Sequence, residues 1–456
     1  MTAEQGSIPK DIATQMAQRR LDIDSLHGNH LLNPQPGRED QLFVLHPNSD
    51  LERWFYEDEE AYQAFEAFPI WRLQRIKQLS FLAYIGPRPE IQMFQEFNHT
   101  RLVHTLTTTR IVETIFKRNY APASIITLGV VSSIAHDMAT PALGDAAKQL
   151  DPKALDEEDH WKDVLGERGK AFLESRGITL EQMNDAIHNR GLVGRVLDIA
   201  DRVSYVMLDL HSLMNTDAVV IGQATDLLPD YRDELARVLA QDTNVGSIYR
   251  DVVINWNTED IYFTNPERLS RFLEIRALLN KHLYLHPVSQ ARDLRVAQAL
   301  RPYYSSDESD ESMLTPSKLR RMGDEEVLHF LSEKHPELEE GIYRNLGKHT
   351  NIFFAFVDWY PQYYERFTTE EELEQRKKEL EADNSLVIIG QKTLKGFNPA
   401  TDLRVMDDDG NIVAFREYDP HCAGRIERIA EATKGYFLYW EDKDRKDRAN
   451  RVQFDI

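Results

Sequence analysis

Apolar side chains recur at intervals of three and four residues through much of the chain from about residue 50 to residue 300. This spacing puts them on one side of a helix and is typical of helices that pack around a shared core. Strand patterns are scarce in the same stretch. We therefore predict an all-α main domain over residues 51–300, with its clearest helices at 71–84, 104–116, 125–135, 192–214 and 269–285.

The pattern changes after about residue 380. Residues 385–390 (SLVIIG), 403–415 (LRVMDDDGNIVAF) and 436–440 (YFLYW) are rich in β-branched and aromatic residues. The second of them contains an Asp-Gly pair that suits a hairpin turn. We expect a small α+β lobe over residues 381–456. The predicted fold class is thus mainly α, with a helical core and a small C-terminal α+β lobe.

Two segments without clear periodicity complete the predicted organisation. Residues 1–50 carry Gly, Asn and Pro punctuation (HGNHLLNPQPGRED) and indicate an irregular N-terminal arm. Residues 305–316 (SSDESDESMLTP) are acidic and polar, which is typical of a solvated loop. We expect residues 301–380 to form an acidic linker and a helical extension.

Composition indicates a globular protein of the cell interior. Hydrophobic residues make up 41% of the chain and charged residues 29%, and Cys422 is its one cysteine. A disulfide framework and a cysteine-based zinc site are therefore excluded, which fits a reducing compartment. The first twenty residues lack the apolar core of a signal peptide, and the longest uncharged stretch, 119–135, is too short to span a bilayer. We expect a cytoplasmic protein without a membrane partner.

The formal net charge of -22, from 54 basic and 76 acidic residues, narrows the classes of partner. Such a surface repels nucleic acid and anionic membranes, so nucleic acid is not expected as a partner. A small anionic substrate can bind only where Arg, Lys, His or a metal ion reverses the field locally.

The main candidate chemistry is a set of histidines and aspartates. His136 and Asp137 are adjacent at the end of an apolar helix, His104 lies 32 residues before His136, and Asp201 lies 64 residues after Asp137. Adjacent helical residues point about 100° apart, so both can reach one ion beside the helix. Imidazole and carboxylate ligands suit Mn, Fe, Mg or Zn. The alternative is a core histidine at 104 and a solvated aspartate at 201.

The order of these ligands resembles that of the HD superfamily of phosphohydrolases. The flanking residues are similar to those of the deoxynucleoside triphosphate triphosphohydrolases, the group that includes the vertebrate enzyme with a SAM and an HD domain. The resemblance covers roughly residues 70 to 290 and is carried by RLQRIKQLS, RLVH, DRVSYVMLD and RALLNKHLYLH. It implies an HD-domain core and the metal ligands His104, His136, Asp137 and Asp201.

The resemblance also implies residues that bind the substrate. Those implied to contact the sugar and the base are Gln78, Tyr205, Asp209 and Tyr284, and those implied to contact the phosphates are Arg101, Arg202 and Arg276, with Arg202 standing where the family has a lysine. Helical spacing is compatible with this assignment, because positions 201, 205 and 209 line one side of a helix. Each residue has an alternative as a core aromatic, an ion-pair partner or a solvated side chain.

The chain departs from the family after the His-Asp pair. It reads HDMATPALGD, so that Asp145 stands where the family keeps a histidine and Lys148 where an acidic partner is common. An aspartate could act as a base or orient water, but it repels a phosphate. His160, in EEDHWKD, could supply the missing acid. The candidate catalytic residues are therefore Asp137, Asp145 and His160.

The resulting prediction is a metal-dependent enzyme, with manganese among its candidate ions, that hydrolyses deoxynucleoside triphosphates (dNTPs) to deoxynucleoside and triphosphate. The family also implies a homo-oligomer. Two alternatives stay open: an HD phosphohydrolase acting on a nucleoside monophosphate or another phosphoester, and a nucleotide-binding sensor with weak or no catalysis.

Overall fold

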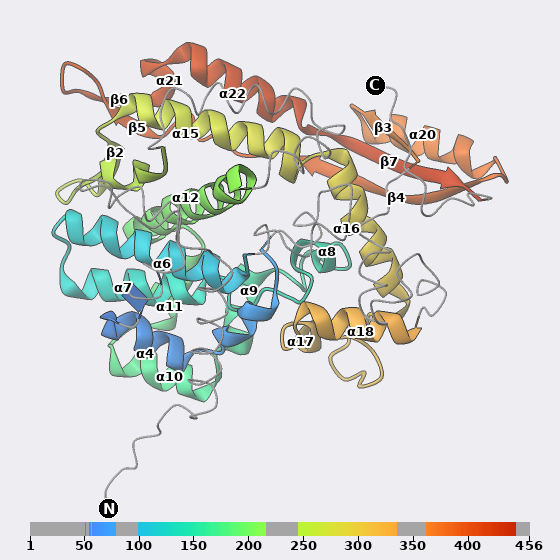
Figure 1. Ribbon diagram of the computed structural model, residues 1–456, viewed down its shortest axis with the longest axis horizontal. Coiled ribbons are helices and arrows are strands. Elements are labelled where there is room, and N and C mark those ends of the chain that lie inside the picture. The colour runs from blue at the N-terminus through green and yellow to red at the C-terminus, as the bar shows by residue number, and fades with distance from the viewer. Residues whose placement is uncertain are drawn as a thin grey trace, which may run out of the picture.

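The structure is a computed structural model that describes residues 51–78 (without 52, 53 and 56), 99–215, 245–334 and 362–443. The predicted N-terminal arm lies outside these residues, as do residues 79–84 of the predicted helix 71–84. The described chain is mainly helical, with small sheets joined to its C-terminal part, as the sequence predicts (Figure 1). No helix in the described ranges is both long and apolar enough to cross a membrane.

Three long helices form the centre of the helical part. They are α6 (Arg101–Arg118), α7 (Ala123–Ala135) and α12 (Gly191–Asn215), close to the predicted bounds. The hydroxyl of Thr100 caps α6 by accepting from the backbone N–H of Val103, and Lys117 and Arg118 complement the dipole at its end. Helix α7 packs very close to α6, because a Cβ at Gly129 would lie only 2.5 Å from the ring of Phe116.

Shorter helices surround this centre. On one side lie α4 (Glu59–Ala67), a 3₁₀ turn (Ile70–Arg75), α9 (Glu157–Val164), α10 (Gly166–Ser175) and α11 (Leu180–Ile187). The α-helix predicted from residue 71 onward is wrong over its described part, because the chain turns out of the 3₁₀ turn into extended backbone at Ile76. Apolar residues from α4, α7 and α11 share a core that includes Phe65, Ile134 and Met183.

A β-hairpin and a second group of helices follow. Strands β1 (Val252–Asn255) and β2 (Asp260–Phe263) lie inside the predicted main domain, so the expectation of an all-α domain is wrong there. The predicted helix 269–285 is α15 (Pro266–Leu279), and it ends in a π-helical turn (Asn280–Tyr284). Helix α16 (Pro287–Leu300) then leads to a polar loop and the helices α17 (Pro316–Leu319) and α18 (Asp324–Lys334).

The C-terminal strands occur where the sequence predicts them. They are β4 (Leu386–Lys395), the hairpin β5 (Arg404–Met406) and β6 (Ile412–Ala414), and β7 (Lys434–Asp442). Strand β3 (Tyr363–Phe367) and helix α20 (Glu370–Glu381) precede them, and α21 (Phe415–Tyr418) and α22 (Pro420–Ala432) lie between β6 and β7.

The C-terminal part is joined to the helical part in two places. Strand β5 pairs in parallel with β2, which gives a four-stranded sheet in the order β1-β2-β5-β6. The other sheet has the order β3-β7-β4, and its β4 packs on α16. Helix α22 lies along α15 above α12 in Figure 1. The C-terminal elements therefore contact the helices that flank α12, rather than forming a separate body.

Candidate metal centre and neighbouring polar residues

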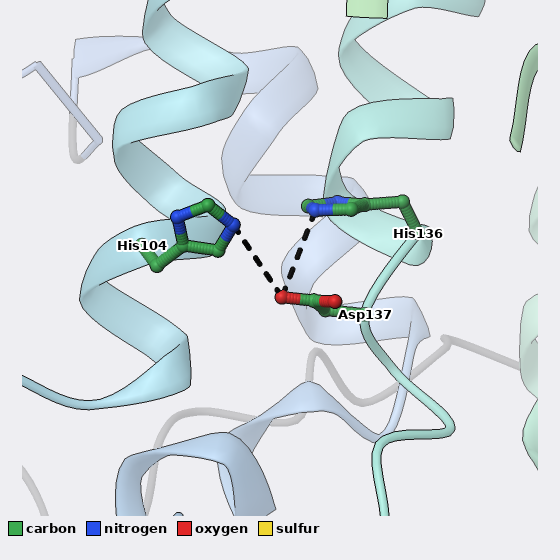
Figure 2. A group of neighbouring side chains, drawn as sticks. All are labelled: His104, His136 and Asp137. Carbon is green, nitrogen blue, oxygen red and sulfur yellow. Dashed lines mark ion pairs between the residues drawn. The ribbon is translucent and has the colours of Figure 1, made fainter. Parts of the chain in front are cut away.

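The four predicted metal ligands come together from three helices. His104 is on α6, His136 and Asp137 follow the last turn of α7, and Asp201 is on α12. His104 Nε2 lies 2.9 Å from Asp201 Oδ1 and 3.6 Å from Asp137 Oδ2. His136 Nε2 lies 3.5 Å and 3.6 Å from the same two oxygens. Figure 2 shows both imidazoles directed at the Asp137 carboxylate.

Hydrogen bonds on the far side of each ring fix which nitrogen carries the proton. His136 Nδ1 lies 2.6 Å from the carbonyl oxygen of Ser133, which can only accept, so Nδ1 is the donor. The Ser204 hydroxyl donates to the backbone oxygen of His104 and also contacts His104 Nδ1 at 3.1 Å. A hydroxyl has one proton to give, so it accepts from Nδ1. In both neutral rings, Nε2 therefore presents a lone pair to the carboxylates.

A lone pair that faces a buried carboxylate is repelled unless a proton or a cation lies between them. His136 Nε2 is buried and lies 3.5 Å from Asp201 Oδ1 and 3.6 Å from Asp137 Oδ2. Ligand atoms around one ion at about 2.1 Å are separated by about 3.0 Å in an octahedron and about 3.4 Å in a tetrahedron. The observed separations of 2.9 to 3.6 Å match these values. His104, His136 and Asp137 can hold a metal ion together, and Asp201 Oδ1 lies beside both imidazoles.

The histidines and aspartates of the cluster shift one another's pKa values. Burial alone would lower the pKa of His136, but the carboxylates of Asp137 and Asp201 raise it to about 9. Burial would raise the pKa values of Asp137 and Asp201, but the histidines outweigh it and lower both. Without a metal ion, the cluster therefore holds a proton on His136 at neutral pH.

Arg101 lies directly beside the cluster. Its side chain is buried, and Nη1 donates to Asp137 Oδ2 at 3.4 Å. Burial would lower its pKa, but Asp137 and Asp145 raise it, so the guanidinium stays charged. Its Nε has no hydrogen-bond partner among the described residues. The structure thus brings one of the predicted phosphate-contacting arginines to the metal ligands.

The residues predicted to contact the nucleoside also lie together. The Tyr284 hydroxyl donates to Asp209 Oδ2, and the rings of Tyr205 and Tyr284 meet edge to face with centroids 5.8 Å apart. No hydrogen bond from the described residues reaches Asp209 Oδ1. Burial raises the pKa of Asp209 to about 7, so its carboxyl group can be protonated near neutrality. Four residues from two distant segments therefore form one network of contacts: Tyr205, Asp209, Arg276 and Tyr284.

Sequence reasoning missed two parts of this contact network. His99 places Nε2 3.4 Å from Asp209 Oδ1, and a signal for it was its position two residues before Arg101. The other part comes from the C-terminal lobe. Arg276 donates from Nε to the Tyr205 hydroxyl at 2.7 Å and from Nη1 to the backbone oxygen of Asn398 at 2.6 Å, and it lies over the ring of Phe397. Nothing in the local sequence indicates that contact.

The loop that follows Asp137 is fixed by hydrogen bonds to residues from two distant segments. Arg72 donates to the backbone oxygens of Met138 and Thr140 at 3.1 and 2.6 Å. Leu143 takes the left-handed conformation with φ 63°, and its N–H donates to the buried Asp324 Oδ1 at 2.7 Å. Thus two residues from distant segments determine the course of the loop that leads to Asp145.

Beyond that loop, Asp145 and Lys148 carry opposite charges. The side chain of Asp145 is more than half exposed, and its Oδ1 lies 3.4 Å from Lys148 Nζ. The positive charge of Lys148 is neutralised by a further carboxylate, that of Glu157, whose Oε2 lies 2.5 Å from Lys148 Nζ. Lys148 is therefore already engaged and does not supply a charge for a ligand.

The remaining predicted residues lie in different surroundings. His160 contacts Asp163 Oδ2 at 2.8 Å and the backbone oxygen of Lys153 at 3.2 Å, and no contact joins it to the metal ligands within the described ranges. Arg202 forms an ion pair with Asp198 at 2.7 Å. The side chain of Gln78 is buried, and its Oε1 has no hydrogen-bond partner in the part of the chain described.

Comparison with known proteins identifies the fold. No protein-family model and no curated protein matches the chain. Among solved structures, a hypothetical protein from Aquifex aeolicus has a TM-score of 0.53 and 16% identity, covering 84% of this chain and 92% of that one. A phosphohydrolase from Bacteroides thetaiotaomicron VPI-5482 has a TM-score of 0.54 and 14% identity, covering 81% and 92%. The chain therefore shares the overall fold of these two proteins.

Proposed function

We propose that this chain is a metal-dependent phosphohydrolase of the HD superfamily. One observation carries the proposal: the Nε2 atoms of His104 and His136 each lie 2.9 to 3.6 Å from the carboxylates of both Asp137 and Asp201. This donor set suits Mn, Fe, Mg or Zn. The similarity in fold to a protein named a phosphohydrolase adds support.

The polar and aromatic residues beside the cluster favour a nucleotide as substrate, and we infer a deoxynucleoside triphosphate because these residues resemble those of the triphosphohydrolases. Asp209, His99 and Tyr284 offer acceptors and donors for hydroxyl groups of a sugar. Tyr205 and Tyr284 offer aromatic faces for a base. The site gathers arginines for phosphate oxygens, because Arg101 and Arg276 are both buried there.

Each of these residues has a separate role in such a reaction. A divalent ion, when bound, would polarise a phosphate oxygen and lower the pKa of a water molecule. Ser204 and the backbone oxygen of Ser133 keep both imidazoles in the tautomer that binds a metal. Arg101 contacts Asp137, and it stabilises the negative charge that develops on the oxygens of the reacting phosphate. Arg276 is fixed by Tyr205 and Asn398, and it holds the phosphate groups that lie farther along the phosphate chain of the substrate.

The experiment is incubation of the full chain with each of the four dNTPs and Mn²⁺, with the products separated by mass. Release of inorganic triphosphate and deoxynucleoside supports attack at the α-phosphorus. Release of orthophosphate from monophosphates instead favours the alternative substrate class, and nucleotide binding without turnover favours a sensor. His136→Ala should abolish turnover, whereas His329→Ala, on the exposed face of α18, should leave it unchanged. Equal turnover by both variants would refute the assignment of the metal site.

A further inference from the structure

Strand β4 of the C-terminal lobe directs Lys392 toward the helical part of the protein. Lys392 is opposite Phe437 in the β4–β7 pairing, and Gly390 is opposite Tyr439. Directly opposite residues share a face of a sheet. Phe437 and Tyr439 are buried in a cluster with Ala291 of α16, so Lys392 lies on the face that covers α16. Its neighbour Lys395 is exposed.

The group that Lys392 faces on α16 is Asp293. Asp293 is only 2% exposed, and its Oδ1 has no hydrogen-bond partner within the described ranges. Lys392 interacts electrostatically with Asp293 and also with Asp145, at the start of α8 (Gly144–Lys148). In the part of the chain described, Lys392 makes neither a hydrogen bond nor an ion pair with either carboxylate. These three residues, called here the Lys392 cluster, are therefore near one another but not in contact.

The Lys392 cluster adjoins the metal centre. Helix α8 packs on α16, with Ala146 and Ala147 against Val296 and Ala297, and Figure 1 shows α8 between the helical core and α16. Asp145 interacts with both Arg101 and Lys392, and Arg101 contacts the metal ligand Asp137. A chain of charged groups therefore runs from the metal ligands to the C-terminal lobe.

The charges around the cluster favour an anion over a second cation. Arg101, Lys148, Arg292 and Lys392 contribute four positive charges, which equal the four carboxylates of Asp137, Asp145, Glu157 and Asp293. Burial also raises the pKa of Asp293 to about 7, so this group carries less than a full charge at neutral pH. In a protein with a net charge of -22, a region whose positive groups equal its carboxylates in number is more positive than the chain as a whole. It suits the oxygens of a phosphate group.

We propose that Lys392 is a phosphate-binding residue of the active site, supplied by the C-terminal lobe to a substrate with a phosphate chain. Asp145 is itself acidic and Lys148 is engaged by Glu157, so Lys392 supplies the positive charge for a phosphate on this side of the site. The lobe then completes the site at two points, since Phe397 and Asn398 already contact Arg276. The inference rests on the proposed phosphohydrolase function for the identity of the substrate, but not for the binding of phosphate itself.

The test measures binding of inorganic triphosphate to the metal-free full chain by isothermal titration calorimetry. Lys392→Met should lower the affinity roughly ten- to a hundred-fold, as expected for loss of a charged hydrogen bond. Lys392→Arg keeps the charge and should stay within about threefold of the wild type, as should Lys395→Met, the matched lysine on the exposed face of β4. Thermal unfolding of each variant checks that the fold is intact.

The outcomes separate the two proposals. If the wild type hydrolyses dNTPs but Lys392→Met binds triphosphate and dNTP as the wild type does, the inference is overturned and the proposed function stands. If no nucleotide is hydrolysed but triphosphate binding depends on Lys392, the proposed function fails and the anion site stands. Absence of triphosphate binding by the wild type also overturns the inference, as does an equal loss in Lys392→Arg and Lys392→Met.

Discussion

The hydrogen bond between Ser204 and His104 makes a quantitative prediction about metal binding. The Ser204 hydroxyl is fully buried and accepts from His104 Nδ1 at 3.1 Å. In Ser204→Ala this acceptor is lost, and the proton of the neutral ring can move to Nε2, where Asp201 Oδ1 accepts it at 2.9 Å. That tautomer cannot bind a metal ion. Loss of such a partner typically lowers metal affinity about 10- to 100-fold.

A matched substitution separates this effect from a loss of stability. Ser132 is also a fully buried serine on a helix, but its hydroxyl contacts Met183 Sδ at 3.4 Å instead of a metal ligand. Both serine-to-alanine changes should cost roughly 0.5–1.5 kcal/mol of unfolding free energy for each hydrogen bond lost. Only Ser204→Ala should weaken the binding of Mn²⁺.

The assay is calorimetric titration of the metal-free chain with Mn²⁺ at fixed pH, with urea unfolding of each variant measured in parallel. We expect Ser132→Ala to bind within about threefold of the wild type and Ser204→Ala to bind at least tenfold more weakly. If Ser204→Ala binds Mn²⁺ as tightly as Ser132→Ala does, the hydrogen bond does not select the tautomer and the argument for the metal centre loses its main support.

Two further predictions concern the cluster and its loop. The carboxylates raise the pKa of His136 to about 9 in the metal-free protein, so Mn²⁺ must displace a proton at neutral pH and its affinity should rise by about tenfold per pH unit up to about pH 9. Titrations in two buffers of different ionisation enthalpy measure this release, and identical heats would contradict it. Arg72→Met removes the donors to Met138 and Thr140 and should cost roughly 1–3 kcal/mol of unfolding free energy. Arg75→Met, which removes a half-exposed ion pair with Glu326, should cost less than about 1 kcal/mol; similar urea midpoints for the two variants would count against the role of Arg72.

Local patterns predicted the elements that carry the metal ligands. Helices α6, α7 and α12 follow from apolar periodicity, because the side that packs on neighbours must be apolar in each turn. The adjacent pair His136-Asp137, at the end of such a helix, marks the site in the amino-acid sequence itself. The strands β4, β5, β6 and β7 were also predictable, since alternation and an Asp-Gly turn are local features.

Only the tertiary structure decided which side chains meet at the candidate site. The approach of Asp201 to His104, the place of His99 next to Asp209 and the reach of Asn398 to Arg276 each join segments that no short-range pattern connects. The same is true of Lys392, which has the pattern of an ordinary strand lysine until the register with Phe437 turns it toward α16. Sequence periodicity specifies the buried side of an element through its near neighbours. Which distant element covers that side depends on the packing of the whole chain.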